Sequence, residues 1–289
     1  MKVLARVCEA CLQPPQGMPP DPSRRDSSSN GSSSGSTGGA STSSTGAGLD
    51  VIVIGQPDGH LQSTDWHVVF ERVDGPCTVR IEINDAVLDT GLCALHVREA
   101  LQPAVFVGAD ADPAGSSSPP ASLLTLLTSS GGSSLLHEGR NDICYTIRTD
   151  RGVGFVRAFL YLWRSTMPAV VFDVDGTVTQ SDIAGQLANV FDGSPTHAGV
   201  CELLCQLHAR GYLVCYLTSR PLLGPSGIDR TRRFLFEVAV DGGSGYRMPP
   251  APVITTTHVH TLSALTAELS GAAVGAGQRS DADLFFMQV

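Results

Sequence analysis

The chain has 289 residues, an apolar fraction of 42% and a formal net charge of −9, which suit a globular protein with room for two domains. The acidic balance, with no basic run longer than two residues, argues against direct binding of nucleic acid. No apolar run approaches the roughly 18 residues of a membrane span, and no signal-peptide pattern opens the chain, so we expect neither membrane insertion nor secretion.

The first predicted element is an amphipathic helix over residues 1–13, because MKVLARVCEACL places its apolar side chains on one stripe. So short a helix needs a partner, either the body of the protein, which the pattern slightly favours, or a bilayer surface. Its CxxC, Cys8 and Cys11, lacks a second pair or a histidine cluster, so we interpret both as apolar helix positions rather than zinc ligands. The eight cysteines are scattered, which predicts reduced thiols rather than a disulfide framework.

Two β-rich segments follow, separated by stretches that offer little to bury. Residues 14–48, rich in Pro, Ser and Gly, are predicted to be a disordered linker. Residues 49–108 open with the strand-like LDVIVIG and continue as short apolar runs between turn residues. A second loose linker is expected over 109–134, and the strand patterns return over 135–167, where DICYTIRT alternates and GFVRAFLYLW reads the same way. The two β segments together suggest a sandwich.

From residue 168 to residue 289, strand-like and helix-like segments alternate, which predicts a parallel sheet with helices on its faces. PAVVFDV and GYLVCYLT are the clearest strands, and HAGVCELLCQLHA is the clearest helix. Chemistry in such sheets lies at the carboxyl ends of the strands. There the sequence places Asp173 and Asp175 after one strand, and Thr218-Ser219-Arg220 after the next.

Asp173 and Asp175 would repel one another at a buried strand end unless a proton, a basic group or a divalent cation balances them. Mg²⁺ prefers oxygen ligands and completes its shell with water and substrate phosphate. One carboxylate can attack phosphorus while the other protonates the departing oxygen. The alternative is a polar turn after a strand, since short motifs give false matches. The hydroxyls and the guanidinium at the second strand end favour the phosphate chemistry.

DVDGT together with YLTSR resembles the aspartate-nucleophile phosphatases of the haloacid dehalogenase superfamily. DVDGTVTQSD, THAGV, RGYLVCYLTSR, DRTRRFL and PPAPVI come in the order seen in lipins, the Mg²⁺-dependent phosphatidate phosphatases. LDVIVIGQPDGHLQSTDWHVVF, LHEGRNDICYTI and RAFLYLW are similar to upstream lipin segments, so matching pieces run from near residue 49 to near residue 270. The resemblance implies a haloacid-dehalogenase-like (LNS2) α/β domain with a Rossmann-like parallel sheet over 168–289. It also implies an immunoglobulin-like β-sandwich formed by the segments before it.

By matched position, the resemblance makes Asp173 the nucleophile and a Mg²⁺ ligand, and Asp175 the general acid and base with its backbone carbonyl on the metal. The phosphate-binding residues would be Thr177, Thr218, Ser219 and Arg220. For Arg232, a contact with the substrate and a solvated charge on a helix are equally open. His197 in THAGV is expected to support the fold or a loop rather than the chemistry.

The resemblance fails downstream, where the superfamily supplies a charge-balancing lysine and, in lipins, an acidic Mg²⁺ ligand in a Gly-Asn-Arg segment. Lys2 is the only lysine, and Arg279 is at best a displaced substitute. Asp281 and Asp283 precede the last strand-like segment, so we do not assign them as ligands. The sheet is therefore expected to be incomplete at its C-terminus. A truncated sequence, a fragment completed by a partner or a missing segment, and a protein that binds phosphatidate without turnover all remain open.

The resemblance implies a phosphatidate phosphatase of triacylglycerol biosynthesis, which forms diacylglycerol and phosphate through an aspartyl-phosphate at a phosphatidate-containing membrane. It would lie in the cytoplasm, peripheral on the endoplasmic reticulum, with the nucleus as a second location. A catalytically impaired phosphatidate-binding or regulatory protein is the alternative. A transcriptional partner is a third hypothesis, because LLTLL at 123–127 fits an LxxLL helix, although so short a motif is weak evidence.

Overall fold

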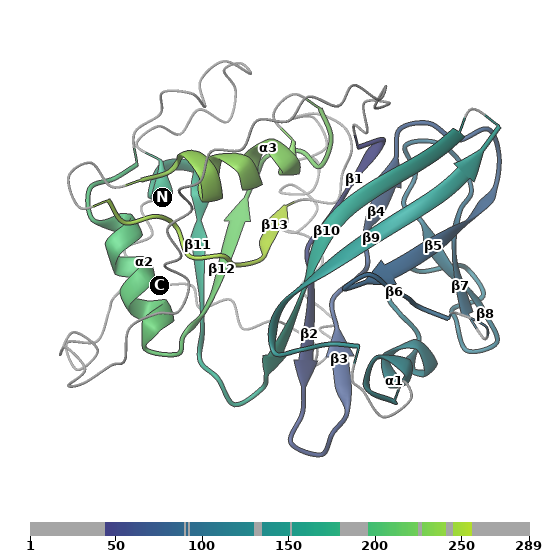
Figure 1. Cartoon of the computed structure of the whole chain (residues 1–289), viewed down its shortest axis with the longest axis horizontal. Helices are drawn as coiled ribbons and strands as arrows, with labels where there is room; N and C mark the ends of the chain where they lie inside the picture. Colours follow the sequence, from purple (N-terminus) through teal and green to yellow (C-terminus); the bar gives the residue numbers. More distant parts are fainter. Residues whose placement is uncertain are drawn as a thin grey trace, which may run out of the picture. The chain divides into compact units, whose positions relative to one another are not determined.

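A computed structural model describes residues 44–89, 91, 93–129, 135–150, 152–179, 196–224, 227–240 and 245–255 (Figure 1). The predicted helix over 1–13, and Arg279, Asp281 and Asp283, lie outside these residues. Within the described ranges, no helix has the length and apolar character needed to cross a membrane.

The β-rich region is built around a long hairpin of β9 (Gly139–Thr149) and β10 (Gly152–Arg164). Ile143, Tyr145 and Ile147 of β9 are buried, as the alternation in DICYTIRT predicts. The sheet runs in the order β3-β2-β10-β9-β5-β7-β8, with β6 paired to β5, and β1 pairs with β4 separately. The remaining strands are β1 (Gly46–Gly48), β2 (Val51–Gly55), β3 (Leu61–Ser63), β4 (Val68–Phe70), β5 (Cys77–Ile83), β6 (Ala86–Val87), β7 (Cys93–Val97) and β8 (Val105–Gly108).

Strand β1 corrects the predicted linker over 14–48, which extends too far. Its three residues are buried and pair antiparallel with β4. A Cβ on Gly46 would lie 2.1 Å from the carbonyl oxygen of Val69, so only glycine allows the two backbones to approach so closely. Composition alone reads these glycines as flexible, whereas here they serve close packing.

Helix α1 (Ala121–Ser129) corrects the loose linker predicted over 109–134. Leu123 and Leu127, four residues apart and so on one helix face, are fully buried in the core of the β-rich region. A docking LxxLL helix must present those leucines to a partner. The motif therefore belongs to the core, and the transcriptional hypothesis loses the observation that prompted it.

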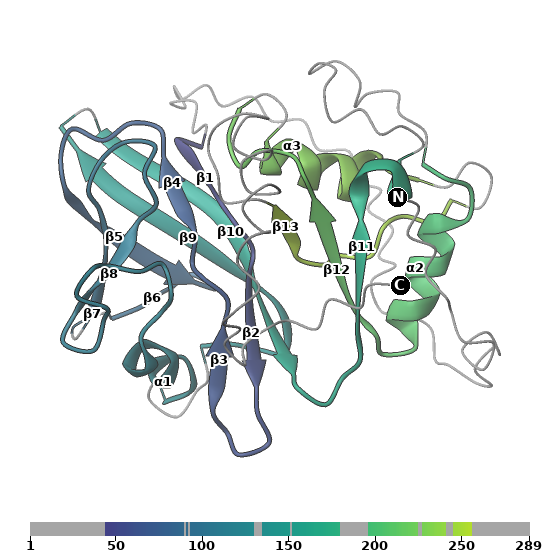
Figure 2. The ribbon, with the colours of Figure 1, turned by 180° about the vertical axis from the view of Figure 1, so that it is seen from behind.

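The second region holds three parallel strands in the order β11-β12-β13, side by side in Figure 2. Its elements are β11 (Ala169–Asp173), the single wide turn η2 (Val174–Val178), α2 (Val200–Ala209), β12 (Leu213–Thr218), α3 (Ile228–Arg233), the wide turn η3 (Phe234–Val238) and β13 (Val253–Thr255). This is the predicted alternation of strand and helix. Helix α2 is VCELLCQLHA, the part of the predicted helical segment HAGVCELLCQLHA that follows Gly199, and it buries Val200, Cys201, Leu204 and Leu207.

The two regions share buried side chains. Ala47 of β1 and Leu49, which follows that strand, belong to the same hydrophobic cluster as Tyr216 of β12 and Val253 of β13. A second, smaller cluster joins Ile52, Tyr161 and Trp163 of the β-rich region to Cys215 of β12. The β-rich region therefore packs directly on the elements that end at the predicted site.

Candidate active site

The site begins where β11 ends at Asp173 and the chain enters η2 without a loop. The turn is anchored from inside: Val174 is fully buried, and its carbonyl oxygen accepts the backbone N–H of Thr179 at 3.0 Å. A turn wider than an α-helical one is common at functional sites. It leaves Asp173 exposed at the strand end, while the Asp175 side chain is only 10% exposed.

Strands β11 and β12 lie parallel with Asp173 opposite Leu217, so Thr218 follows one residue further along. Thr218 is buried, and its hydroxyl donates to Oδ2 of Asp175 over 2.8 Å. The two strand ends singled out from the sequence thus meet in one place. The Thr218 hydroxyl therefore contacts Asp175, whereas the lipin resemblance predicts that it binds the phosphate.

Arg220 holds the other oxygen of Asp175. Its Nε donates to Oδ1 at 2.9 Å, and its Nη2 lies 2.7 Å from the same oxygen. The loop around it is fixed as well: the Arg220 N–H donates to the Thr218 hydroxyl at 3.2 Å, and the Thr255 hydroxyl donates to the Arg220 carbonyl. Burial lowers the pKa of Arg220, and the charge on Asp175 opposes that effect. Arg220 therefore balances one of the two carboxylates.

The other predicted site residues are placed as follows. Thr177 lies half-buried in η2, and Ser219 is exposed immediately after β12. His197 is exposed, and its backbone N–H donates to the Val178 carbonyl at 3.0 Å, which ties the following segment to the end of η2. That placement agrees with a supporting role for THAGV.

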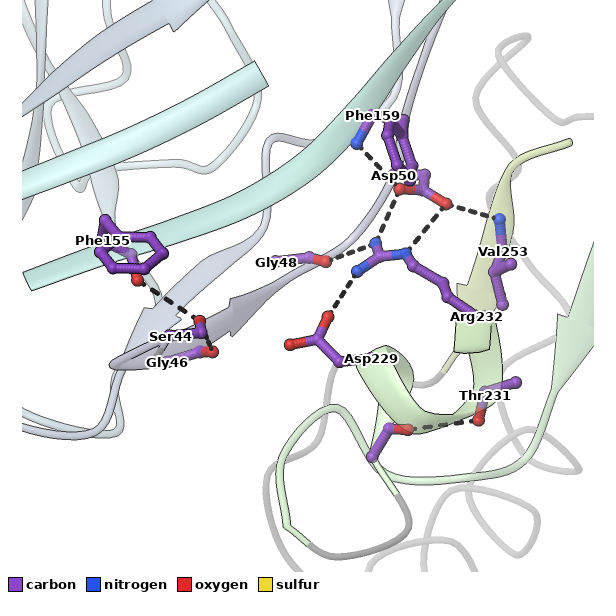
Figure 3. Close-up of polar contacts among 11 residues, drawn as sticks. Ser44, Gly46, Gly48, Asp50, Phe155, Phe159, Asp229, Thr231, Arg232 and Val253 are labelled. Atoms are coloured by element: carbon purple, nitrogen blue, oxygen red, sulfur yellow. Dashed lines mark hydrogen bonds and ion pairs between the residues drawn. The ribbon is translucent and has the colours of Figure 1, made fainter. Parts of the chain in front are cut away.

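Arg232 lies away from the strand ends, in a cluster at the joint between the two regions (Figure 3). The residue is only 7% exposed, which rules out a solvated helix charge. Its guanidinium bonds to Asp50, Asp229 and the carbonyl of Gly48, so protein acceptors take the groups that a substrate would need. Asp50 is not among the residues predicted from the sequence. An acidic residue inside the apolar run LDVIVIG was the available signal, since a buried charge requires a partner.

A divalent ion would depend on few protein ligands here. In the described part of the chain, no three His, Cys, Asp or Glu residues are grouped so as to hold a metal. Mg²⁺ often uses one or two carboxylates and takes the rest of its shell from water and phosphate. The exposed carboxylate of Asp173 is a suitable hard oxygen donor. The Asp173 carboxylate therefore suits a Mg²⁺ ion whose remaining ligands are water and the phosphate of the substrate.

A cavity of about 340 Å³ lies elsewhere, near the beginnings of β12 and β13. Leu213, Pro250 and Trp163 are among its lining residues, and none of the predicted site residues takes part. Because parallel strands carry their chemistry at the carboxyl ends, this cavity is not the reaction site.

Comparison with known proteins is consistent with this geometry. Residues 126–273 match the family LNS2 (Lipin/Ned1/Smp2). Phosphatidic acid phosphohydrolase 1 of Saccharomyces cerevisiae is 33% identical over 131 residues, 45% of this chain and 14% of its own length. Nuclear elongation and deformation protein 1 of Schizosaccharomyces pombe is 33% identical over 134 residues, 46% and 19% of the two chains. Phosphatidate phosphatase PAH1 of Arabidopsis thaliana is 32% identical over 120 residues, 41% and 13%. The aligned part thus spans less than a fifth of each relative.

Proposed function

Because this chain belongs to the LNS2 (Lipin/Ned1/Smp2) family, we propose that it is a phosphatidate phosphatase that hydrolyses phosphatidate to diacylglycerol and phosphate. The family match confirms the lipin resemblance and brings with it a haloacid-dehalogenase-like fold for the α/β region. One observation carries the proposal: the ends of β11 and β12 meet, so that Thr218 and Arg220 grip Asp175 beside an exposed Asp173.

In the first step, a carboxylate oxygen of Asp173 forms a bond to phosphorus while the bond from phosphorus to the diacylglycerol oxygen breaks. Asp175 first takes up a proton from solvent, after phosphate binding has released it from Thr218 and Arg220. It then gives this proton to the departing oxygen, which leaves as the hydroxyl of diacylglycerol. In the second step, Asp175 takes a proton from water, the water oxygen bonds to phosphorus, and the bond to Asp173 breaks. Phosphate leaves, Asp175 returns its proton to solvent, and both carboxylates are restored.

The contacts of Asp175 indicate how the substrate would prepare it. Both of its oxygens accept hydrogen bonds, one from Thr218 and the other from Arg220. A carboxylate held in this way cannot donate a proton, so these contacts must be released before the acid step. Thr218 and Arg220 are themselves donors suited to phosphate oxygens. A bound phosphate monoester would compete for both of them and leave Asp175 free to carry the proton.

Mg²⁺ is part of the proposal, with Asp173 and Asp175 as its protein ligands. When bound, the ion would neutralise negative charge on the phosphate and on the two carboxylates. Arg220 already balances Asp175 in the described structure, so the remaining repulsion concerns Asp173 and the incoming phosphate.

The setting of the enzyme is likewise proposed. The substrate is a membrane lipid, so the protein would act at a phosphatidate-containing surface, peripheral on the endoplasmic reticulum, on the cytoplasmic side. We also propose that the β-rich region corresponds to the immunoglobulin-like sandwich of lipins, because Val68 and Phe70 of the separate strand pair β1-β4 share one hydrophobic core with the long sheet.

Phosphate release from phosphatidate in mixed micelles, with Mg²⁺ and with a chelator, tests the function. The full chain should release phosphate only with Mg²⁺, and Asp173→Asn should abolish release because an amide is a far weaker nucleophile. Asp150→Asn, an equivalent change in the exposed turn between β9 and β10, is the matched control and should keep full activity. Equal rates for the Asp173→Asn variant and the unmodified chain would remove the proposed nucleophile.

A second candidate is a protein that binds phosphatidate without hydrolysing it. The engagement of both Asp175 oxygens favours it. Flotation with vesicles containing phosphatidate distinguishes the two candidates. Binding that depends on Arg220, without any phosphate release, would support this second candidate, whereas turnover would exclude it.

A further inference from the structure

Asp50 and Arg232, which are buried, and Asp229, whose side chain is 55% exposed, form a group, here called the interface cluster, where the β-rich region meets α3 and β13 (Figure 3). Asp50 lies between β1 and β2, and its side chain is fully buried. Arg232 comes from the last turn of α3, 182 positions further along the sequence. An isolated carboxylate in this position would be very costly, so its partners define its role.

The carboxylate of Asp50 joins three separate elements. Oδ1 accepts the N–H of Phe159 in β10 at 3.0 Å and Nη2 of Arg232 at 2.7 Å. Oδ2 accepts the N–H of Val253, the first residue of β13, at 2.8 Å, and Nε of Arg232 at 3.4 Å. A single side chain from the β-rich region therefore fixes the start of β13 and the end of α3 together.

Arg232 closes the cluster from the other side. Nη2 also donates to the carbonyl of Gly48 at 2.8 Å, and Nη1 donates to Oδ1 of Asp229 at 2.8 Å. Burial lowers the pKa of Arg232, but the charges on Asp50 and Asp229 outweigh it, so the pKa lies above its ordinary value. Arg232 is thus a permanent cation, and its fork fits these acceptors in one orientation.

The elements that the cluster fixes are the ones that frame the active site. Strand β13 continues from Val253 to Thr255, which lies opposite Thr218, and whose hydroxyl donates to the Arg220 carbonyl. The loop that carries Arg220 runs from the end of β12 to the start of α3, where the N–H of Ile228 donates to the Leu222 carbonyl at 3.1 Å. A continuous path of bonds therefore leads from Asp50 to Arg220 and on to Asp175.

We propose that Asp50 is a positioning residue for the active site: through Val253 and Arg232 it holds β13 and α3, and these set the place of Arg220. The expected effect of Asp50 on kcat rests on the proposed phosphatase function, whereas its effect on the position of Arg220 does not. Displacing a catalytic group by about 1 Å can cost roughly a hundredfold in rate. The β-rich region would then determine turnover without touching the substrate.

Asp50→Asn is the informative substitution because it keeps the shape and removes one acceptor. If the amide nitrogen replaces Oδ2, it faces the N–H of Val253, and if it replaces Oδ1, it faces the N–H of Phe159. Either way a donor meets a donor. Asn141→Ala is the matched control: Asn141 is also buried and bonds to Asn84, His137 and the carbonyl of Leu160, all within the β-rich region.

The experiment measures three quantities for the full chain and both variants: melting temperature, kcat and KM on phosphatidate micelles, and amide hydrogen exchange in Ser219–Gly224. We expect both variants to melt lower. Well below melting, Asp50→Asn should lower kcat roughly 10–100-fold with little change in KM and should speed exchange in that loop. Asn141→Ala should do neither. Should Asp50→Asn fail to fold, Arg232→Lys keeps the charge but loses the fork, and it should change kcat and exchange in the same direction.

An unchanged kcat and unchanged exchange in the Asp50 variant would overturn the positioning role, as would an equal loss of kcat in the Asn141 control. If the unmodified chain shows no turnover, the proposed function fails, and hydrogen exchange alone then decides about Asp50. Faster exchange confined to Ser219–Gly224 supports the positioning role, whereas exchange that is unchanged or raised throughout the chain contradicts it.

Discussion

The pairs Arg220–Asp175 and Arg232–Asp50 use the same two residue types at the same separation, 2.7 Å, in different settings. The donors to Asp175 are a hydroxyl and a guanidinium, both on side chains that can turn toward another acceptor. Asp50 is held in addition by two backbone amides, which cannot turn. The source of the donors, more than the length of the ion pair, thus separates a group available for chemistry from one that fixes structure.

The largest expected effect comes from removing the charge at the strand end. Asp175→Asn should lower kcat by roughly 10²–10⁴-fold, because an amide cannot exchange a proton with the leaving oxygen or with water. Its melting temperature should also fall, because the substitution leaves the largely buried guanidinium of Arg220 without its carboxylate partner. Phosphate release and thermal melting, measured on one preparation, check both expectations. A variant that melts much lower but turns over at the normal rate would show that Asp175 serves stability and not catalysis.

The next effect is on folding, at the interface cluster. Arg232→Ala leaves Asp50 buried without its cation and should reduce the free energy of unfolding by roughly 3–5 kcal/mol. The neighbouring Arg233 is exposed and pairs with Glu237 on the same helical segment, so Arg233→Ala should cost less than about 0.5 kcal/mol. Urea unfolding of the two variants gives the comparison directly. Similar losses in both would show that the buried pair contributes no more than a surface pair.

A smaller effect is expected at Arg220, where charge and geometry can be separated. Arg220→Lys keeps the cation but not the fork, and Arg220→Gln loses both, so we expect kcat/KM to fall about tenfold and about a hundredfold, respectively. Arg148→Gln, an exposed change on β9, should leave kcat/KM unaltered. Steady-state kinetics on phosphatidate micelles checks the order. If the lysine variant were as impaired as the glutamine variant, geometry rather than charge would be decisive.

The smallest effect concerns Cys215, which packs at the joint with Ile52, Tyr161 and Trp163. Burial, assisted by the charge on Asp50, raises the pKa of the Cys215 thiol to about 12 from 9.0. Above pH 9 the unfolded chain loses this proton while the folded chain keeps it. Stability should therefore hold below pH 9 and fall as the pH rises toward about 12.

Urea unfolding at about pH 8 and about pH 11 measures that fall. Cys215→Val should show a shallower fall, not a flat line, because burial also raises the pKa of Tyr145, Tyr161 and Tyr216. Equal slopes for the variant and the unmodified chain would mean that the thiol is accessible to water in the folded state.

The sequence predicted the strand ends because their signals are local. A β-branched run followed by Asp-Val-Asp-Gly-Thr marks the end of β11, and parallel strands bring their carboxyl ends to one edge. The superfamily pattern predicts a downstream lysine as the balancing cation, whereas in the structure Arg220, two residues after Thr218, pairs with Asp175. Side-chain directions beyond a strand end depend on the backbone path of the loop, and no periodicity encodes that path.

The linkers predicted from composition over 14–48 and 109–134 each include residues that the structure places in a strand or a helix. Gly46 is one of many glycines in a serine-rich stretch, yet β4 leaves no room for a side chain there. Leu123 and Leu127 sit beyond a Pro-rich segment, yet they fill the core of the β-rich region. Both roles depend on a neighbour distant in sequence, so composition in a local window cannot reveal them.

The sequence by itself determined the order of the elements, the carboxylates at the end of β11 and membership of the LNS2 family. Only the tertiary structure decided which arginine does what. Arg220 and Arg232 follow the same strand within one short segment, and their local patterns do not distinguish them. Arg232 is a buried structural cation because folding brings Asp50 beside it from 182 positions away. The loss of water around such a pair depends on tertiary packing, so the sequence around either residue does not reveal it.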